Sequence, residues 1–274
     1  MDRHHCAVPA GPDGPNGRKA ANEALAAARQ AVALAPQLGI AHATLAEVLS
    51  RLFFDFAAAA PEYRRALELS PGDARVLTRA SIYLAQMGRF DEALAHVQRA
   101  GVLDPLNAHT QAYIGSVFDI GRRYRAGIEA YDRAVQLDPR NHWFRSDKGG
   151  MLLKLGDPEA ALQTCLAPRI EHSAPALEEN DQWCLALAYD KLGRRAQAEA
   201  ALTALQAAAS NAWAYQYAQI YAQWGNTRKA LDWLDKAYQL KDPGLIFLKM
   251  DSLLDPLRQE PGFQAIYGEL NFPP

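Results

Sequence analysis

Cysteine is scarce in this sequence, which has three in 274 residues. Cys6, Cys165 and Cys184 are too few and too scattered for a disulfide framework. Cys165 and Cys184 fall inside helical patterns, so we expect them to be buried free thiols. His4, His5 and Cys6 offer donors for a transition metal, but no fourth ligand lies near them. We therefore expect an idle tail here, with no metal site and no cofactor.

Long apolar runs and a large net charge are also missing. No stretch reaches the roughly 18 to 20 apolar residues of a membrane-spanning helix, and the start lacks the apolar core of a signal peptide. The formal net charge of -2 gives no overall attraction to nucleic acids or anionic membranes. The 49% hydrophobic content is ample for a core. We therefore expect a soluble cytoplasmic protein whose partner is neither nucleic acid nor membrane.

Motifs that carry known chemistries are absent as well. The sequence contains no P-loop, no G-x-S-x-G, no H-E-x-x-H, no C-x-x-C and no glycine-rich dinucleotide fingerprint. We therefore expect a protein that is not an enzyme. If a catalytic group were hidden in a groove, Asp147, His109 and Glu179 would be the first candidates.

A repeat is what the sequence does contain. Pro71, Pro105 and Pro139 stand 34 residues apart, and each follows an alanine five places back. Small residues also recur inside the repeat, as at Ala59 and Ala93, where two helices are expected to cross closely. A period of this length is typical of stacked helical hairpins, each too small to bury its apolar face alone. The pattern predicts an all-α fold, a right-handed superhelical solenoid.

The repeat pattern divides the chain into regions. We expect a flexible tail (1–17), a half-repeat helix (18–38), six helix pairs (39–244) with a break near 168–178, and a helical cap (245–274). At the break, Pro168 predicts a short or distorted second helix in the fourth pair, because an interior proline costs about 3 kcal/mol. A loop is expected around residues 174–180. Gly149 fits a close helix crossing, whereas Gly150 leaves room for a ligand, allows a bend, or is a tolerated weakness.

These alanines, glycines and prolines resemble the tetratricopeptide repeat (TPR), with the best match from 59 to 139. The segment 233–266 resembles the end of the TPR arrays that follow a nucleotide cyclase, winged-helix or TolB-like domain in bacterial regulators. No such effector domain is found here, so we expect a free-standing relative or a detached sensory half. The resemblance implies that apolar residues of the ending cover the sixth pair; these are Leu245, Phe247, Leu253, Leu254, Leu257, Phe263 and Ile266.

In the family, ligands bind on the inner, concave wall, which the first helix of each pair lines. Carried over position by position, the resemblance predicts a partner-binding groove made of Arg51, Arg75, Thr78, Arg79, His109, Tyr113, Trp143, Asp147, Trp183, Tyr215, Gln216 and Gln219. The arginines suit a carboxylate or phosphate, and the aromatic side chains suit a peptide. The alternative is that the aromatic rings pack between helices and the arginines are solvated.

Three functions follow, in order of preference. The first is a noncatalytic scaffold that binds a protein or peptide in its concave groove. The second is a sensory or regulatory module that binds a small ligand and acts on a separate effector. The third is an enzyme with an active site in the groove.

Overall fold

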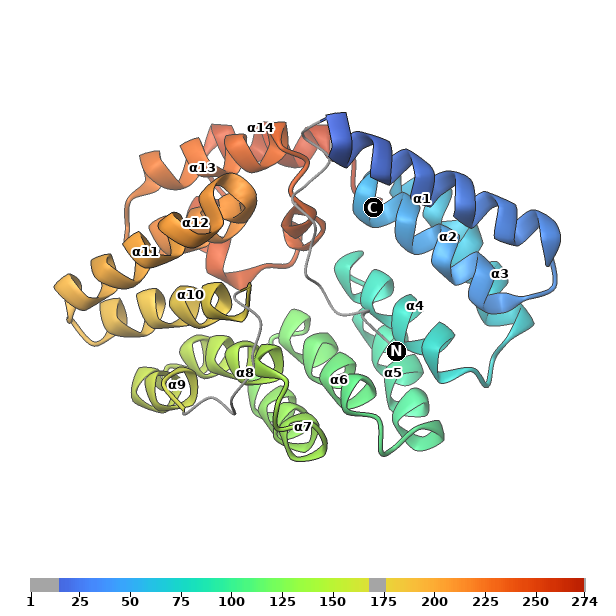
Figure 1. Cartoon of the computed structure of the whole chain (residues 1–274), viewed down its shortest axis with the longest axis horizontal. Coiled ribbons are helices and arrows are strands. Elements are labelled where there is room, and N and C mark those ends of the chain that lie inside the picture. The colour runs from blue at the N-terminus through green and yellow to red at the C-terminus, as the bar shows by residue number, and fades with distance from the viewer. Residues whose placement is uncertain (1–14, 168–175, 274) are drawn as a thin grey trace.

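The fold is a curved stack of helical hairpins. The computed structural model describes residues 15–167 and 176–273, where it contains helices and no strand. The hairpins are α2–α3, α4–α5, α6–α7, α8–α9, α10–α11 and α12–α13, and α1 packs on the first of them. Figure 1 shows them following one another around a nearly closed ring. This arrangement confirms the predicted all-α, right-handed superhelical solenoid.

Their bounds are α1 (Pro15–Leu34), α2 (Gly39–Leu52), α3 (Phe56–Leu69), α4 (Ala74–Gln86), α5 (Phe90–Leu103), α6 (Ala108–Ile120), α7 (Tyr124–Leu137), α8 (His142–Leu155), α9 (Pro158–Cys165), α10 (Ala176–Lys191), α11 (Arg195–Ala209), α12 (Ala214–Gln223), α13 (Thr227–Gln239) and α14 (Pro261–Glu269). Three short 3-10 helices complete the set: η1 (Ser210–Trp213), η2 (Pro243–Phe247) and η3 (Ser252–Leu257).

The repeat fixes where the inner helices begin. Asp73, Asn107 and Asn141 each stand two residues after a repeat proline and immediately before α4, α6 or α8. Each side chain accepts a hydrogen bond, 2.9 to 3.2 Å long, from the backbone N–H two residues further on. Such caps satisfy N–H groups that the first helical turn leaves without partners. Because these N-terminal capping residues recur every 34 residues, equivalent positions of α4, α6 and α8 lie on the same side of their helices and line the inner wall.

Small residues let the helices of a hairpin approach one another. Ala59, Ala93 and Ala161 are fully buried where the paired helices cross. A Cβ atom added to Gly115 would lie 2.5 Å from the Tyr131 ring, which is closer than such atoms can approach. Packing at native density leaves no space for a larger side chain at these points.

The break in the repeat differs in part from its prediction. As expected, α9 is short, with 8 residues against the 14 of α7. The expected loop around 174–180 is wrong from residue 176 onward, because α10 already begins at Ala176. Leucine and glutamate in this stretch are good helix formers, which explains the earlier start. Pro168 and the His4–Cys6 run lie outside the described residues, and α1 begins at Pro15, inside the expected tail.

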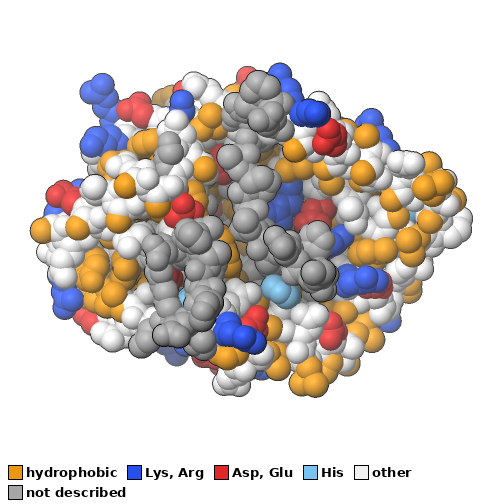
Figure 2. Space-filling view, viewed as in Figure 1, with side chains coloured by type: hydrophobic (Ala, Val, Ile, Leu, Met, Phe, Trp, Pro, Cys, Tyr) orange, Lys and Arg blue, Asp and Glu red, His pale blue; other side chains and the backbone are white. Residues whose placement is uncertain are grey.

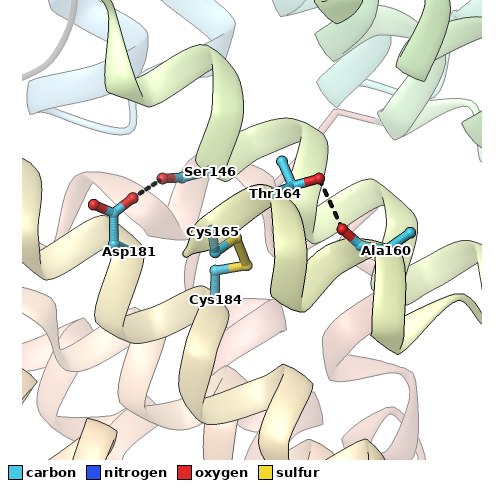
Figure 3. Close-up of a disulfide and its surroundings, with 6 residues drawn as sticks. All are labelled: Ser146, Ala160, Thr164, Cys165, Asp181 and Cys184. Carbon is cyan, nitrogen blue, oxygen red and sulfur yellow. Dashed lines mark hydrogen bonds between the residues drawn. A yellow bond between two sulfur atoms is a disulfide. The ribbon is translucent and has the colours of Figure 1, made fainter. Parts of the chain in front are cut away.

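The prediction of free thiols is wrong, because Cys165 and Cys184 form a disulfide between α9 and α10 (Figure 3). The sequence separation of 19 residues gave no sign of this pairing, since the fold of the break brings the two helices together. The sulfur atoms pack on Gly149, where an added Cβ would lie 2.7 Å from the sulfur of Cys184. An added Cβ at Gly150 would lie 2.8 Å from the Trp183 indole. Trp183, rather than a ligand, therefore fills the room that Gly150 leaves.

The carboxy-terminal segment packs on the last hairpin and also contacts the first. Its apolar side chains Leu254, Leu257 and Phe263 are buried, and η3 and α14 pack on the sixth hairpin. It also reaches back to the amino-terminal hairpins, as the Phe272 ring stacks on Phe56 with 4.7 Å between centroids. In Figure 1 this end of the chain lies beside α2. We call residues 243–273 the cap; it joins the last hairpin to the first.

Candidate binding face on the inner wall

The predicted groove residues all lie on the first helices of the six hairpins. They are Arg51 on α2; Arg75, Thr78 and Arg79 on α4; His109 and Tyr113 on α6; Trp143 and Asp147 on α8; Trp183 on α10; and Tyr215, Gln216 and Gln219 on α12. The structure places them in different environments along the wall.

At the amino-terminal end, two arginines share one carboxylate. Arg51 Nη1 lies 3.4 Å from Glu47 Oε1, and Arg79 Nε lies 3.3 Å from Glu47 Oε2. Arg79 also donates to Thr44 Oγ1 at 2.8 Å. The three charged side chains remain 22 to 28% exposed. Two guanidinium groups therefore meet at one carboxylate, on a surface that water can reach.

Arg75 and Thr78 do not join this pair. Arg75 donates to the Asp73 carboxylate at 2.8 and 3.2 Å, and these bonds lower the pKa of Asp73, which also caps α4. The Thr78 side chain is buried and donates to the Ala74 carbonyl of its own helix. Arg75 is thus a solvated, exposed residue, and Thr78 is a packing residue.

Several aromatic side chains pack between helices. His109 meets the Phe144 ring edge-on with 5.4 Å between centroids, and Trp143 stacks on Trp213 at 6.3 Å. Tyr113 and Trp143 stay half-buried. The sequence left open whether these rings pack or bind, and for His109 and Trp143 the structure provides packing partners within the chain.

A polar chain crosses the middle of the wall. The Tyr131 hydroxyl lies 2.8 Å from Ser116 Oγ and donates to Asp147 Oδ2 at 3.1 Å. Burial raises the pKa of Asp147 to about 7; the hydrogen bond from Tyr131 opposes this rise and nearby Asp119 adds to it. Asp147 on α8 is therefore a carboxyl that titrates near neutral pH and is held by Tyr131 of the preceding hairpin.

At the carboxy-terminal end, the wall holds the cap. Asp251 accepts hydrogen bonds from the Tyr215 hydroxyl at 2.9 Å and from Gln219 Nε2 at 2.6 Å. The Trp183 indole N–H donates to Gln219 Oε1 at 2.9 Å. All four side chains are buried. Two residues predicted to bind a partner, Tyr215 and Gln219, thus bind an acidic residue of the chain's own cap, and Trp183 holds Gln219 in place.

Sequence reasoning missed Glu47 and Asp251, the carboxylates at the two ends of the wall. Neither position is part of the repeat pattern. Asp251 also lies in the cap, which has no repeat from which to predict the side chains that face the wall. A lone acidic residue between the apolar residues of the cap, as in KMDSLL, was the available signal.

A metal cluster and a membrane-spanning helix are both absent from the part of the chain that the structure describes. No group of three histidine, cysteine or acidic side chains there is arranged to hold a metal ion. None of its helices has the length and hydropathy to cross a membrane. Figure 2 shows basic and acidic side chains next to each other near the centre of the visible face.

Comparisons with known proteins agree with this architecture. Tetratricopeptide-repeat models match residues 54–112, 118–171 and 214–242. Small glutamine-rich tetratricopeptide repeat-containing protein 2 of Mycosarcoma maydis is 29% identical over 87 residues, which are 32% of this chain and 25% of that protein. Anaphase-promoting complex subunit 3 of Schizosaccharomyces pombe is 35% identical over 81 residues, 30% of this chain and 12% of that protein. The matches thus span a quarter or less of these relatives.

A solved structure extends the likeness to most of the chain. The APC/C hetero-tetramer Cut9-Hcn1 has a TM-score of 0.59 at 13% identity, and the match covers 92% of this chain and 46% of that one. At this identity the likeness concerns the fold alone. The three family matches cover just over half of the residues, and together with the helical hairpins they show that the chain belongs to the tetratricopeptide-repeat proteins.

Proposed function

We propose that this protein is a noncatalytic scaffold that binds an extended protein or peptide segment on the inner wall of its first four hairpins. TPR proteins are typically interaction scaffolds, and the names of two similar proteins refer to subunits of an assembly, the anaphase-promoting complex. The proposed face consists of Arg51, Arg79, Tyr113 and Asp147, on α2, α4, α6 and α8.

One observation carries the proposal. The inner wall of the last hairpins holds a segment of irregular backbone around Asp251, through buried hydrogen bonds and flanking leucines. The amino-terminal wall offers related chemistry, with the guanidinium groups of Arg51 and Arg79 and a half-buried Tyr113. Charge-assisted hydrogen bonds and aromatic anchors are typical of peptide recognition. The partner segment is expected to be acidic.

The test compares two pairs of arginines. The partner is captured from the source organism, identified by mass spectrometry and purified. Its affinity is then measured for the wild type, for Arg51→Gln with Arg79→Gln, and for a control with Arg64→Gln and Arg99→Gln. Arg64 and Arg99 are exposed on the second helices α3 and α5, so both variants lose the same charge. We expect the wall variant to bind at least roughly tenfold more weakly. Equal weakening in both variants would remove the wall from the interaction.

A second function has an observation of its own. A cavity of about 300 Å³ lies between the cap and the inner wall, which favours a regulatory module that binds a small ligand and acts on a separate effector. The resemblance of residues 233–266 to the arrays of cyclase, winged-helix or TolB-like regulators is consistent with this second function and remains a hypothesis.

Location and the excluded partners also remain predictions. A cytoplasmic location conflicts with the Cys165–Cys184 disulfide, because such bonds are rare in reducing compartments. Titration of free thiols in protein purified under alkylating conditions decides whether the bond exists in the cell. Gel-shift assays with DNA and RNA, and sedimentation with anionic vesicles, test the expectation that neither nucleic acid nor membrane is bound.

A further inference from the structure

The short helix α9 is held in place by few interactions. Three of its eight side chains are buried, and these are Ala161, Leu162 and Cys165. Within the described residues none of its side chains makes a hydrogen bond or ion pair with another helix, and Thr164 donates to the Ala160 carbonyl of α9 itself. By contrast, α7 has 14 residues, and its Arg133 donates to Gln111 of α6. Since so short a helix is unstable alone in water, the position of α9 depends strongly on its disulfide to Cys184.

The disulfide lies where α8, α9 and α10 meet. Figure 3 shows Cys165 and Cys184 joined between α9 and α10, and Gly149 of α8 packs on both sulfur atoms with no space for a Cβ atom. Cys184 is fully buried and Cys165 is 7% exposed. Two separate thiols need more room than a disulfide, because sulfur atoms without a bond between them stay at van der Waals distance. In a site packed at native density, reduction therefore forces one of the two cysteines to move.

Cys184 lies in α10, a helix of 16 residues that is fixed on both sides by buried hydrogen bonds. Asp181 accepts from Ser146 of α8 at 2.8 Å. Trp183 donates to Gln219 of α12 at 2.9 Å. No such bond holds α9 among the residues that the structure describes. Movement of α9 away from α10 is therefore the least costly response to reduction.

We propose that Cys165 and Cys184 form a reversible redox switch, which holds α9 against α10 when oxidised and lets α9 separate when reduced. The reductant is a dithiol. One of its thiolates attacks the sulfur of Cys165, the more exposed of the two cysteines, and Cys184 leaves as a thiolate. The second thiol of the reductant then displaces Cys165, so the reductant ends as a disulfide and its two protons pass to the two cysteines. A small disulfide oxidant reverses both steps.

The switch acts on the fourth hairpin alone. When α9 separates, Leu162 becomes exposed together with the surface of α8 around Gly149 that α9 covers. The cap stays in place in both states, because Tyr215 and Gln219 of α12 hold it. The first three hairpins are likewise unchanged, since their crossings do not involve the disulfide. The inference therefore goes beyond the scaffold function and does not depend on it.

The test is hydrogen exchange by the full chain, followed by mass spectrometry. The protein is compared after oxidation with oxidised glutathione, after reduction with dithiothreitol and after reoxidation. On reduction we expect the amides of α9 to exchange at least about tenfold faster, because local opening exposes them, while those of α7 exchange as before. Reoxidation should restore the slow exchange. Cys165→Ala with Cys184→Ala is the control, since its exchange should respond to neither reagent.

Alkylation of the reduced protein by N-ethylmaleimide is a second measurement. Cys165 on the separated helix should react at least about tenfold faster than Cys184, which stays buried in α10. The proposal is overturned if α9 exchanges equally in both states, if α7 loses protection together with α9, or if the slow exchange does not return on reoxidation. Equal alkylation rates of the two cysteines would overturn it as well.

Discussion

The first three hairpins and the last three are held together by different interactions. In the amino-terminal half, small residues such as Ala93 mark the crossings, and the buried hydroxyls of Thr78 and Ser81 donate to carbonyls of their own helix. In the carboxy-terminal half, buried polar groups pair across hairpins. Ser146 donates to Asp181 at 2.8 Å, and Trp183 donates to Gln219 (Figure 3 shows the first pair).

The difference follows the repeat. Where the 34-residue period is regular, equivalent positions of successive hairpins meet, and the repeated small residues bring each hairpin to the next. Single hydrogen bonds, such as that from Tyr83 to the Phe56 carbonyl, add to this packing. Where the period fails, the Cys165–Cys184 disulfide and specific hydrogen bonds determine which surfaces meet. Buried polar pairs favour a single arrangement, since any other leaves their groups without partners. The four changes below test this comparison, from the largest expected effect to the smallest.

The strongest test removes the carboxylate that holds the cap. Asp251→Ala leaves the buried Tyr215 hydroxyl and Gln219 amide without their acceptor. We expect a loss of about 4 kcal/mol in the free energy of unfolding, since each hydrogen bond to a charged group contributes about 1.5 to 3 kcal/mol. Urea unfolding measures this loss. Asp235→Ala on the exposed face of α13 is the control, and an equal effect of the two changes would show that the cap needs no such anchor.

The second test opens the disulfide. A closed loop of about 20 residues restricts the unfolded chain, so we expect reduction to cost about 3 kcal/mol. The measurement is the urea midpoint with and without a phosphine reductant. A double variant, Cys165→Ala with Cys184→Ala, should be insensitive to the reductant. If the urea midpoint of the wild type does not change with the reductant either, the disulfide does not stabilise the region where the repeat is interrupted.

The third test crowds a crossing in the regular half. Ala93→Leu adds three carbon atoms to a fully buried site and should destabilise the protein by about 2 kcal/mol through overpacking. Ala95→Leu makes the same change on the exposed face of α5 and should have little effect. Thermal unfolding followed by circular dichroism compares the two. Equal melting temperatures would mean that the crossing tolerates larger residues.

The smallest effect concerns pH, because Asp147 is partly exposed and water screens its charge. The folded pKa of Asp147, about 7, lies above its ordinary value of 3.8, so the folded state binds this proton more tightly than the unfolded state does. Its stabilising contribution is full below about pH 4 and is lost as the pH rises through 7. Asp147→Asn should therefore stabilise the protein more at pH 8 than at pH 5, by urea unfolding. Asp232→Asn, on the exposed face of α13, should show no such difference. If the stability gained by Asp147→Asn were the same at both pH values, that result would contradict the raised pKa.

Much of the inner wall was predictable, but its partners were not. The repeat placed Arg79, Tyr113, Trp183 and Tyr215 on the first helices, because position within the period decides the helix and its face. It gave no information on what each side chain meets. Tyr215 meets Asp251, which lies 36 residues further on in a segment outside the repeat.

By itself, the sequence determined the fold class, the hairpins and the starts of α4, α6 and α8, because proline stops, capping residues and small crossing residues act over a few positions of the chain. Tertiary structure decided the disulfide, the filling of the carboxy-terminal groove by the cap and the cavity between η3 and the inner wall. These features depend on the way in which the small rotations between successive hairpins add up around the superhelix. Their sum brings the cap onto the first hairpins and α9 against α10, which no local pattern encodes.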